Sequence, residues 1–259
     1  MPRAFWKGVI SFGLVAIPVK MYVGAESKTL SFHLLHKKCL TRPKQVLHCD
    51  TDDEYFGIKE TVRGYEVAKE QYVVLNDSDF EKVPIKTSHA IDILGFVEAK
   101  EIDPLYYHGV HYLEPEELGV KPFQLLKEAL VKTGRVGIGK VTFQRREHLG
   151  CLRPLEDIII LHTIHYETEI LSRKEITPPK AKVTEAELNM AVSLVKAMAK
   201  SFKPAEYKDE YHEALKRLVE AKVKGEKIVA PVMPKVEVGD LMAALRASIE
   251  ATRKEPALK

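Results

Sequence analysis

The stretch RAFWKGVISFGLVAIPVK, residues 3–20, decides the fold. Apolar residues alternate along it with small or polar ones, which is the pattern of a half-buried strand. Gly13 and Pro18 interrupt the pattern, and such residues occupy turns, bulges or edges of sheets. We therefore expect two opening strands, over Val9–Phe12 and Leu14–Tyr22. The stretch is basic and holds no acid, but its alternation and breaks suit a barrel strand, so its main role is in the fold.

More runs of β-forming residues follow, separated by turn residues. They are Gln71–Leu75, Ala90–Val97, Val110–Leu113, Gly137–Phe143 and Asp157–Tyr166. Gly95 is expected to mark a bulge. One helix interrupts the strands over Glu116–Lys132 and ends at Gly134. Its apolar residues at helical spacing are Leu118, Phe123, Leu126 and Leu130. Many short strands with turns between them predict an antiparallel barrel or sandwich.

The C-terminal third is helical. Thr184 and Glu187 form a capping box that opens a helix over Thr184–Phe202, and its apolar face holds Leu188, Val192, Val195, Met198 and Phe202. A second helix is expected over Glu206–Val223, with Tyr211, Leu215, Leu218 and Ala221 facing inward. Residues 226–238 contain two prolines and predict an extended linker. An amphipathic helix follows over Gly239–Arg253. The predicted fold class is α+β, with an antiparallel β-barrel core and a helical C-terminal region.

Basic charge gathers in separate blocks. The chain of 259 residues has a formal net charge of only +3 and is 45% hydrophobic, which is enough for a real core. Residues 134–153 nevertheless carry five arginines and lysines against the single acid Glu147. One block alone is as well explained by a solvated surface, but three blocks in one strand-rich region favour a surface for phosphates. The candidate contacts are Lys20, Lys37, Lys38, Arg42, Lys44, Arg135, Lys140, Arg145, Arg146 and Arg153.

Other chemistry fits the residues less well. Zinc ligands near His36, Cys39, His48 and Cys49 have poor spacing for a closed tetrahedral site, so we expect no metal and no cofactor. Cys151 with His148 or His162 is a conceivable nucleophile and base, but a cysteine between Gly150 and Leu152 is more typical of packing. We expect no catalytic residues and no enzyme. The alternative interpretation is a metal-dependent nucleic-acid-processing enzyme on a β-barrel scaffold. Three cysteines, no signal peptide and no membrane-length apolar run favour a prokaryotic cytoplasm.

Several motifs resemble one family. Residues 4–20 resemble the opening of bacterial Ku proteins almost position for position. Further similar blocks lie at Gly64–Glu66, Tyr72–Leu75, Glu101–Tyr107, Tyr112–Pro115, Arg145–Leu149, Leu152–Pro154 and Tyr207–Gly225. Because they cover nearly the whole chain in order, the resemblance to the prokaryotic Ku family is far more specific than one short motif.

This resemblance implies a homodimeric ring that grips ends of double-stranded DNA, without reading sequence, in non-homologous end joining. It implies a barrel core over residues 1–180 with a bridge at about 26–65 that meets its counterpart in a second subunit. Lys37, Lys38, Arg42 and Lys44 are then placed in the bridge, and Lys140, Arg145 and Arg146 on the barrel side of the channel. The protein is expected in the cytoplasm, associated with the nucleoid.

The resemblance also assigns the C-terminal parts. Residues 181–225 form the helical end of the core, 226–238 the linker, and 239–259 a tail that resembles the segment by which bacterial Ku recruits the ATP-dependent DNA ligase D. An amphipathic helix can dock its apolar stripe in a partner's groove, and the stripe here consists of Leu241, Leu245 and Ile249. The alternative is that this helix folds back on its own core.

Overall fold

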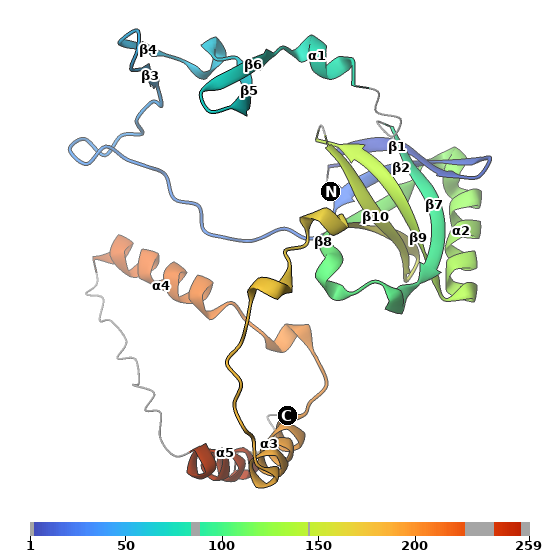
Figure 1. Cartoon of the computed structure of the whole chain (residues 1–259), viewed down its shortest axis with the longest axis vertical. Helices are drawn as coiled ribbons and strands as arrows, with labels where there is room; N and C mark the ends of the chain where they lie inside the picture. The colour runs from blue at the N-terminus through green and yellow to red at the C-terminus, as the bar shows by residue number, and fades with distance from the viewer. Residues whose placement is uncertain (1–2, 84–88, 145, 226–240, 255–259) are drawn as a thin grey trace. The chain divides into compact units, whose positions relative to one another are not determined.

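The computed structural model describes residues 3–83, 89–144, 146–225 and 241–254. It divides into two compact units, residues 1–172 and 173–259 (Figure 1). Arg145 and the expected linker at 226–238 lie outside the described residues.

The first unit contains a closed barrel. Its strands, in order around the barrel, are β1 (Trp6–Phe12), β2 (Val15–Val23), β8 (Tyr107–Pro115), β11 (Ile158–Ile164), β10 (Arg146–Leu155), β9 (Arg135–Phe143) and β7 (Ala90–Glu98). The barrel is thus confirmed, and closure removes the free strand edges of an open sheet. The expectation of antiparallel pairing fails at one seam, because β1 pairs with β7 in parallel. A parallel pair needs a long connection, and here β2 and the segment at 24–89 supply it. The register shift between Ile93 and Gly95 confirms the bulge.

The barrel interior is apolar and continuous with one helix, α2 (Val120–Thr133). Cross-strand partners such as Ile10 and Ile17, or Leu152 and Leu161, are completely buried. From α2, the side chains of Phe123, Leu126 and Leu130 join this core. The helix ends at Gly134, whose φ of 65° is left-handed, as expected. Leu118 does not join the predicted helical face: it lies in the short turn η4 (Glu117–Gly119) ahead of α2 and is exposed.

Strand β10 was not predicted, because charged residues, Gly150 and Pro154 break its apolar pattern. Its inward positions include Gly150 and Leu152, which face Thr163 and Leu161 of β11. A Cβ atom on Gly150 would lie 2.7 Å from the Leu161 side chain. The glycine that weakens the sequence pattern is therefore what lets β10 approach β11.

Residues 24–89, which we call the insertion, leave the barrel between β2 and β7. They form the hairpin of β3 (Leu47–Cys49) and β4 (Glu54–Phe56), the hairpin of β5 (Arg63–Ala68) and β6 (Gln71–Leu75), and the short helix α1 (Asp77–Glu81). Neither hairpin belongs to the barrel sheet. Not one described residue of the insertion is buried.

The remaining elements of the first unit are short turns that lead into or out of strands. They are η1 (Ile58–Glu60), η2 (Ala99–Glu101), η3 (Pro104–Tyr106) and η5 (Glu167–Glu169).

The second unit consists of α3 (Glu185–Met198), α4 (Glu210–Lys224) and α5 (Leu241–Lys254), with the turns η6 (Arg173–Glu175) and η7 (Pro204–Glu206). The capping box at Thr184 is confirmed, since the Glu187 amide donates to Thr184 Oγ1 and the Thr184 amide to Glu187 Oε2. The expectation that Tyr211 and Leu218 face inward is wrong: both are exposed. The apolar face predicted on the first helix is also exposed, at Leu188, Val192, Val195, Met198 and, beyond the end of α3, Phe202. Three short helices are too few to enclose a core of their own.

Candidate nucleic-acid interface

Two of the predicted basic residues, Lys140 and Arg146, lie toward the turn end of the β9–β10 hairpin. Lys140 lies near the end of β9, and Arg146 is the first residue of β10. Both are only partly covered, so a phosphate has access to them. Arg145, between them in sequence, lies outside the described residues.

Each of these two cations already has a carboxylate partner. Lys140 Nζ donates to Glu147 Oε1 over 2.8 Å, and Arg146 Nη2 donates to Glu169 Oε1. Tyr166 lies between the two pairs: its hydroxyl is 3.4 Å from the same Glu147 oxygen, and its ring centroid is 6.0 Å from Lys140 Nζ. The sequence count of charge in residues 134–153 missed Glu169, which comes from η5 and is distant in the chain.

The electrostatics follow this arrangement. The hydrogen bond and the charge of Glu147 raise the pKa of Lys140, so the ammonium stays charged. Burial, and then the Glu147 charge, raise the pKa of Tyr166, so its hydroxyl keeps its proton. An anion that binds Lys140 or Arg146 must therefore compete with an internal carboxylate partner.

The other basic residues of the barrel lie apart from this pair. Arg135 begins β9, about 17 Å along an extended strand from Lys140, and its guanidinium donates to the Phe96 carbonyl over 3.4 Å. Arg153 Nη2 lies 3.4 Å from His162 Nε2 on β11. Lys20 faces Lys7 and Glu114 on its two neighbouring strands. The barrel cations therefore do not form one cluster.

The insertion carries Lys37, Lys38, Arg42 and Lys44, and all four are exposed. Lys37 and Lys38 lie within a turn, and Arg42 and Lys44 follow it; in this turn the Leu40 amide donates to the His36 carbonyl and the His36 amide donates to the Thr41 carbonyl. Within the described part of the chain, none of the four basic side chains forms an ion pair. These cations differ from Lys140 and Arg146, each of which binds a carboxylate in the described structure.

The metal and nucleophile candidates are separate small groups. Cys39 Sγ lies 2.9 Å from Thr41 Oγ1 and 3.0 Å from His36 Nδ1. These hydrogen bonds, that of Thr41 first, lower the Cys39 pKa to about 7. His48 contacts Asp50 and Asp53 instead, and Cys49 contacts Asp52. Among residues that the structure describes, no group of three or more His, Cys, Asp or Glu side chains is arranged to hold a metal ion.

Cys151 is completely buried between β9 and β11, and burial raises its pKa. A buried thiol of raised pKa is not a nucleophile at neutral pH, which agrees with the packing role expected for it. Burial lowers the pKa values of His148 and His162.

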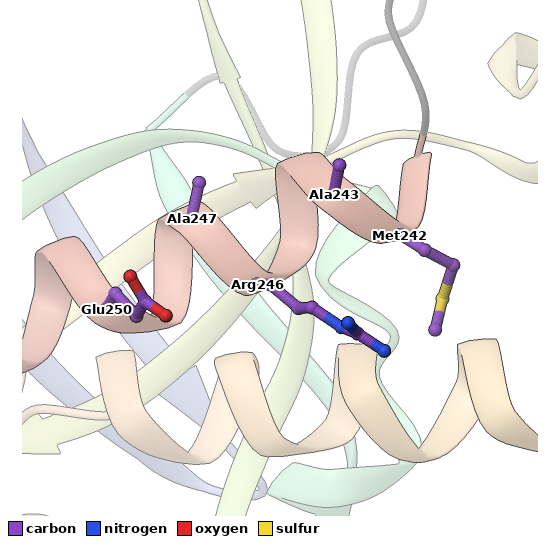
Figure 2. A pocket seen from close by; sticks show the side chains of 5 residues that line it. All are labelled: Met242, Ala243, Arg246, Ala247 and Glu250. Carbon is purple, nitrogen blue, oxygen red and sulfur yellow. The ribbon is translucent and has the colours of Figure 1, made fainter.

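The C-terminal helix α5 packs against α3 within the second unit. Leu245 and Ile249 are partly covered, whereas Leu241 is exposed. A shallow groove of about 450 Å³ runs along α5, lined by Met242, Ala243, Arg246, Ala247 and Glu250. Figure 2 shows Met242 and Arg246 pointing toward the neighbouring helix, and Ala243 and Ala247 pointing away from it. Two of the three stripe residues predicted to bind a partner, Leu245 and Ile249, are thus partly covered within this structure.

No helix in the described ranges combines the length and the apolar character that crossing a membrane requires.

Comparison with known proteins gives consistent matches over the whole chain. The Ku70/Ku80 beta-barrel domain family matches residues 11–190. A protein of Solibacter usitatus (strain Ellin6076), named non-homologous end joining protein Ku, is 41% identical over 263 residues that cover 100% of this chain and 98% of the relative. Proteins of the same name from Archaeoglobus fulgidus and Bacillus subtilis (strain 168) are 42% and 37% identical, over 97% of this chain in both cases and over 100% and 83% of the relatives.

Proposed function

The chain belongs to the Ku family of non-homologous end joining proteins, and on that premise we propose that it binds ends of double-stranded DNA as a homodimeric ring. Binding is independent of sequence and serves the repair of double-strand breaks, in the prokaryotic cytoplasm at the nucleoid. The protein acts by holding DNA and recruiting a ligase, not by catalysis. The observation that carries the proposal is the insertion, which exposes apolar side chains and also Lys37, Lys38, Arg42 and Lys44, four cations with no ion pair among the described residues.

A second copy of the chain is the proposed cover for the β5–β6 hairpin. Tyr65 and Val73 are direct cross-strand partners, and their side chains are 65% and 48% exposed. An isolated two-stranded hairpin is marginally stable in water. A two-fold axis would place the same hairpin of a second subunit against this face and bury both.

The unpaired cations of the insertion support binding to the DNA backbone. Lys37, Lys38, Arg42 and Lys44 carry the positive charge and the hydrogen-bond donors that bind phosphate oxygens. Contacts of this kind fix the protein on phosphates without reading sequence, and they release counterions, so affinity falls steeply as salt rises.

A closed ring explains a preference for ends, because it can load only over a free terminus. The test compares affinity for a linear duplex with affinity for a closed circular duplex of the same sequence. We expect tight binding to the linear form and only weak binding to the circle. Equal affinity for the two forms would contradict the ring.

The tail at 239–259 is proposed to recruit the ATP-dependent DNA ligase D. Exposed Leu241 and the partly covered Leu245 and Ile249 supply an apolar stripe for a groove. Deleting residues 240–259 should abolish ligase stimulation and leave DNA binding unchanged. Loss of DNA binding with ligase stimulation intact would overturn this division of roles.

A further inference from the structure

The end of the first unit is held to the β9–β10 hairpin by side chains. Residues His165–Glu169 follow β11, and we call them the latch. The Glu169 carboxylate accepts from the Arg146 guanidinium and lies 3.5 Å from His165 Nδ1. One turn earlier, the Tyr166 hydroxyl contacts Glu147, the carboxylate that also binds Lys140. The latch is therefore attached directly to Arg146 and, through Glu147 of β10, to Lys140, which are two of the barrel cations that the sequence assigned to phosphate.

Glu169 also organises the latch itself. The Tyr166 amide donates to Glu169 Oε2 over 3.0 Å, and the Ile170 amide donates to the Glu167 carbonyl over 3.1 Å. The His165 amide donates to the Tyr106 carbonyl over 2.8 Å. One carboxylate thus closes the turn and fixes it to Arg146, so breaking the ion pair with Arg146 weakens the anchoring of the whole segment.

These ion pairs are suited to exchange. The side chains of Lys140 and Glu147 are 38% and 36% exposed, and those of Arg146 and Glu169 are 57% and 28% exposed. Exposed ion pairs contribute little net stability. A phosphate offers the guanidinium and the ammonium the same kind of charge-assisted acceptor as a carboxylate. DNA can therefore replace Glu147 and Glu169 at little cost.

The position of the latch in the chain gives this exchange a consequence. Ser172 is the last residue of the first unit, and Arg173 begins the unit that contains α3, α4 and α5. We propose that the latch, through Glu169, competes with DNA phosphates for Arg146, so that DNA binding detaches residues 165–169 and lengthens the tether of the C-terminal helices. This inference rests on the proposed function, because it requires DNA at the barrel. By linkage, a change that raises the fraction of molecules with an open latch strengthens DNA binding by the same factor as that fraction rises.

The first test measures affinity for a linear duplex in the full chain. Glu169→Gln removes the competing charge and should tighten binding about two- to five-fold, the range that an exposed ion pair supports. Glu167→Gln is the matched control, since Glu167 lies in the same turn and its exposed side chain has no partner among the described residues. An equal gain in both variants would reveal a general charge effect and overturn the latch, as would an unchanged or weaker affinity in Glu169→Gln.

The second test follows hydrogen exchange of the amides of residues 165–170 in the wild-type protein, with and without a linear duplex. Release should speed their exchange on DNA binding, roughly ten-fold where one anchoring hydrogen bond breaks. In Glu169→Gln the exchange should be fast in both states. Slower or unchanged exchange with DNA bound would overturn the latch and leave the proposed function standing. Failure of the wild-type protein to bind the duplex would instead overturn the proposed function.

Discussion

The barrel and the insertion differ in how far they bury their own apolar side chains. In the barrel, side chains such as Ile17, Met21 and Leu161 are completely buried by neighbouring strands. In the insertion, Tyr65, Tyr72 and Val74 are at least half exposed although they lie in strands of the same composition. The barrel explains its apolar residues by itself. For those of the insertion, we propose that a second copy of the chain supplies the cover.

The charges of the two regions differ in the same way. Lys140 and Arg146 of the barrel are held by Glu147 and Glu169, whereas the lysines at 37 and 38 in the insertion are exposed without an ion pair in the described residues. At a paired cation, phosphate must compete with the carboxylate partner, whereas at a cation without such a partner it displaces only water. The insertion is therefore expected to provide the larger part of the affinity for DNA.

The largest expected effect breaks the barrel. Leu161→Ala removes a completely buried side chain and should lower the free energy of unfolding by about 2–5 kcal/mol. Leu34→Ala is the matched control in the insertion, where the side chain is 85% exposed, and should change it by less than about 0.5 kcal/mol. Denaturant unfolding followed by circular dichroism measures both. Comparable losses would show that the insertion has a core of its own.

The next largest effect tests whether a second subunit covers the β5–β6 hairpin of the insertion. Val73→Asp places a charge on the β5–β6 face, and in a buried interface an unpaired charge should weaken self-association by about 30-fold or more. Sedimentation equilibrium measures the association, and the melting temperature of the barrel should stay unchanged. Val120→Asp, at an exposed position that begins α2, is the control and should leave association intact. If Val73→Asp self-associates as tightly as the wild-type protein, the subunit contact lies elsewhere.

Removing basic side chains from each region in turn tests which region contributes more to DNA binding. Lys37→Gln with Lys38→Gln should reduce the slope of log affinity against log salt by about 1.8, or 0.9 for each phosphate that the protein no longer neutralises. Lys140→Gln with Arg146→Gln should reduce it less, because these cations exchange one anion for another. Fluorescence anisotropy over a salt series gives both slopes. A larger drop for the barrel pair would reverse the assignment.

The smallest effect is a dependence of stability on pH that belongs to the barrel. Burial lowers the pKa values of His111, His148 and His162 in the fold. In the unfolded chain these groups titrate near pH 6.5, so the unfolded state takes up protons first as pH falls. Stability should be complete above about pH 6.5 and decline below it. His111→Gln should flatten the decline, whereas His33→Gln, at an exposed site in the insertion, should not. Unfolding midpoints of the wild-type protein and both variants, measured across this pH range, test the prediction.

The sequence predicted much of the barrel because its strands obey a simple alternation. The opening strands, β6, β7, β9 and β11 all appear close to their expected bounds. Strand β10 was not predicted, because Gly150 and Pro154 interrupt the apolar pattern of a strand. The structure shows that Gly150 instead makes room for the Leu161 side chain. The apolar stripes of the C-terminal helices were also visible in the sequence. A sequence pattern does not tell whether such a stripe faces its own chain or another molecule.

The candidate site was harder to predict than the fold. The basic blocks were visible, yet the carboxylate on Arg146 comes from Glu169, which only the barrel's closure brings near. The contact between Glu147 and Lys140 was predictable from a β9–β10 hairpin, because Lys140 pairs with Leu149 and Glu147 is then its diagonal neighbour on the facing strand. Which basic residues contact DNA stays a prediction.

The central claim is that two insertions close a ring around DNA, and a topological experiment tests it most directly. The protein is loaded on a long linear duplex, the ends are joined into a circle, and the salt is raised to about 1 M, where phosphate contacts are screened. A threaded ring should remain on the circle, leave the linear duplex, and leave the circle once it is cut. Equal loss from circular and linear DNA would contradict the ring.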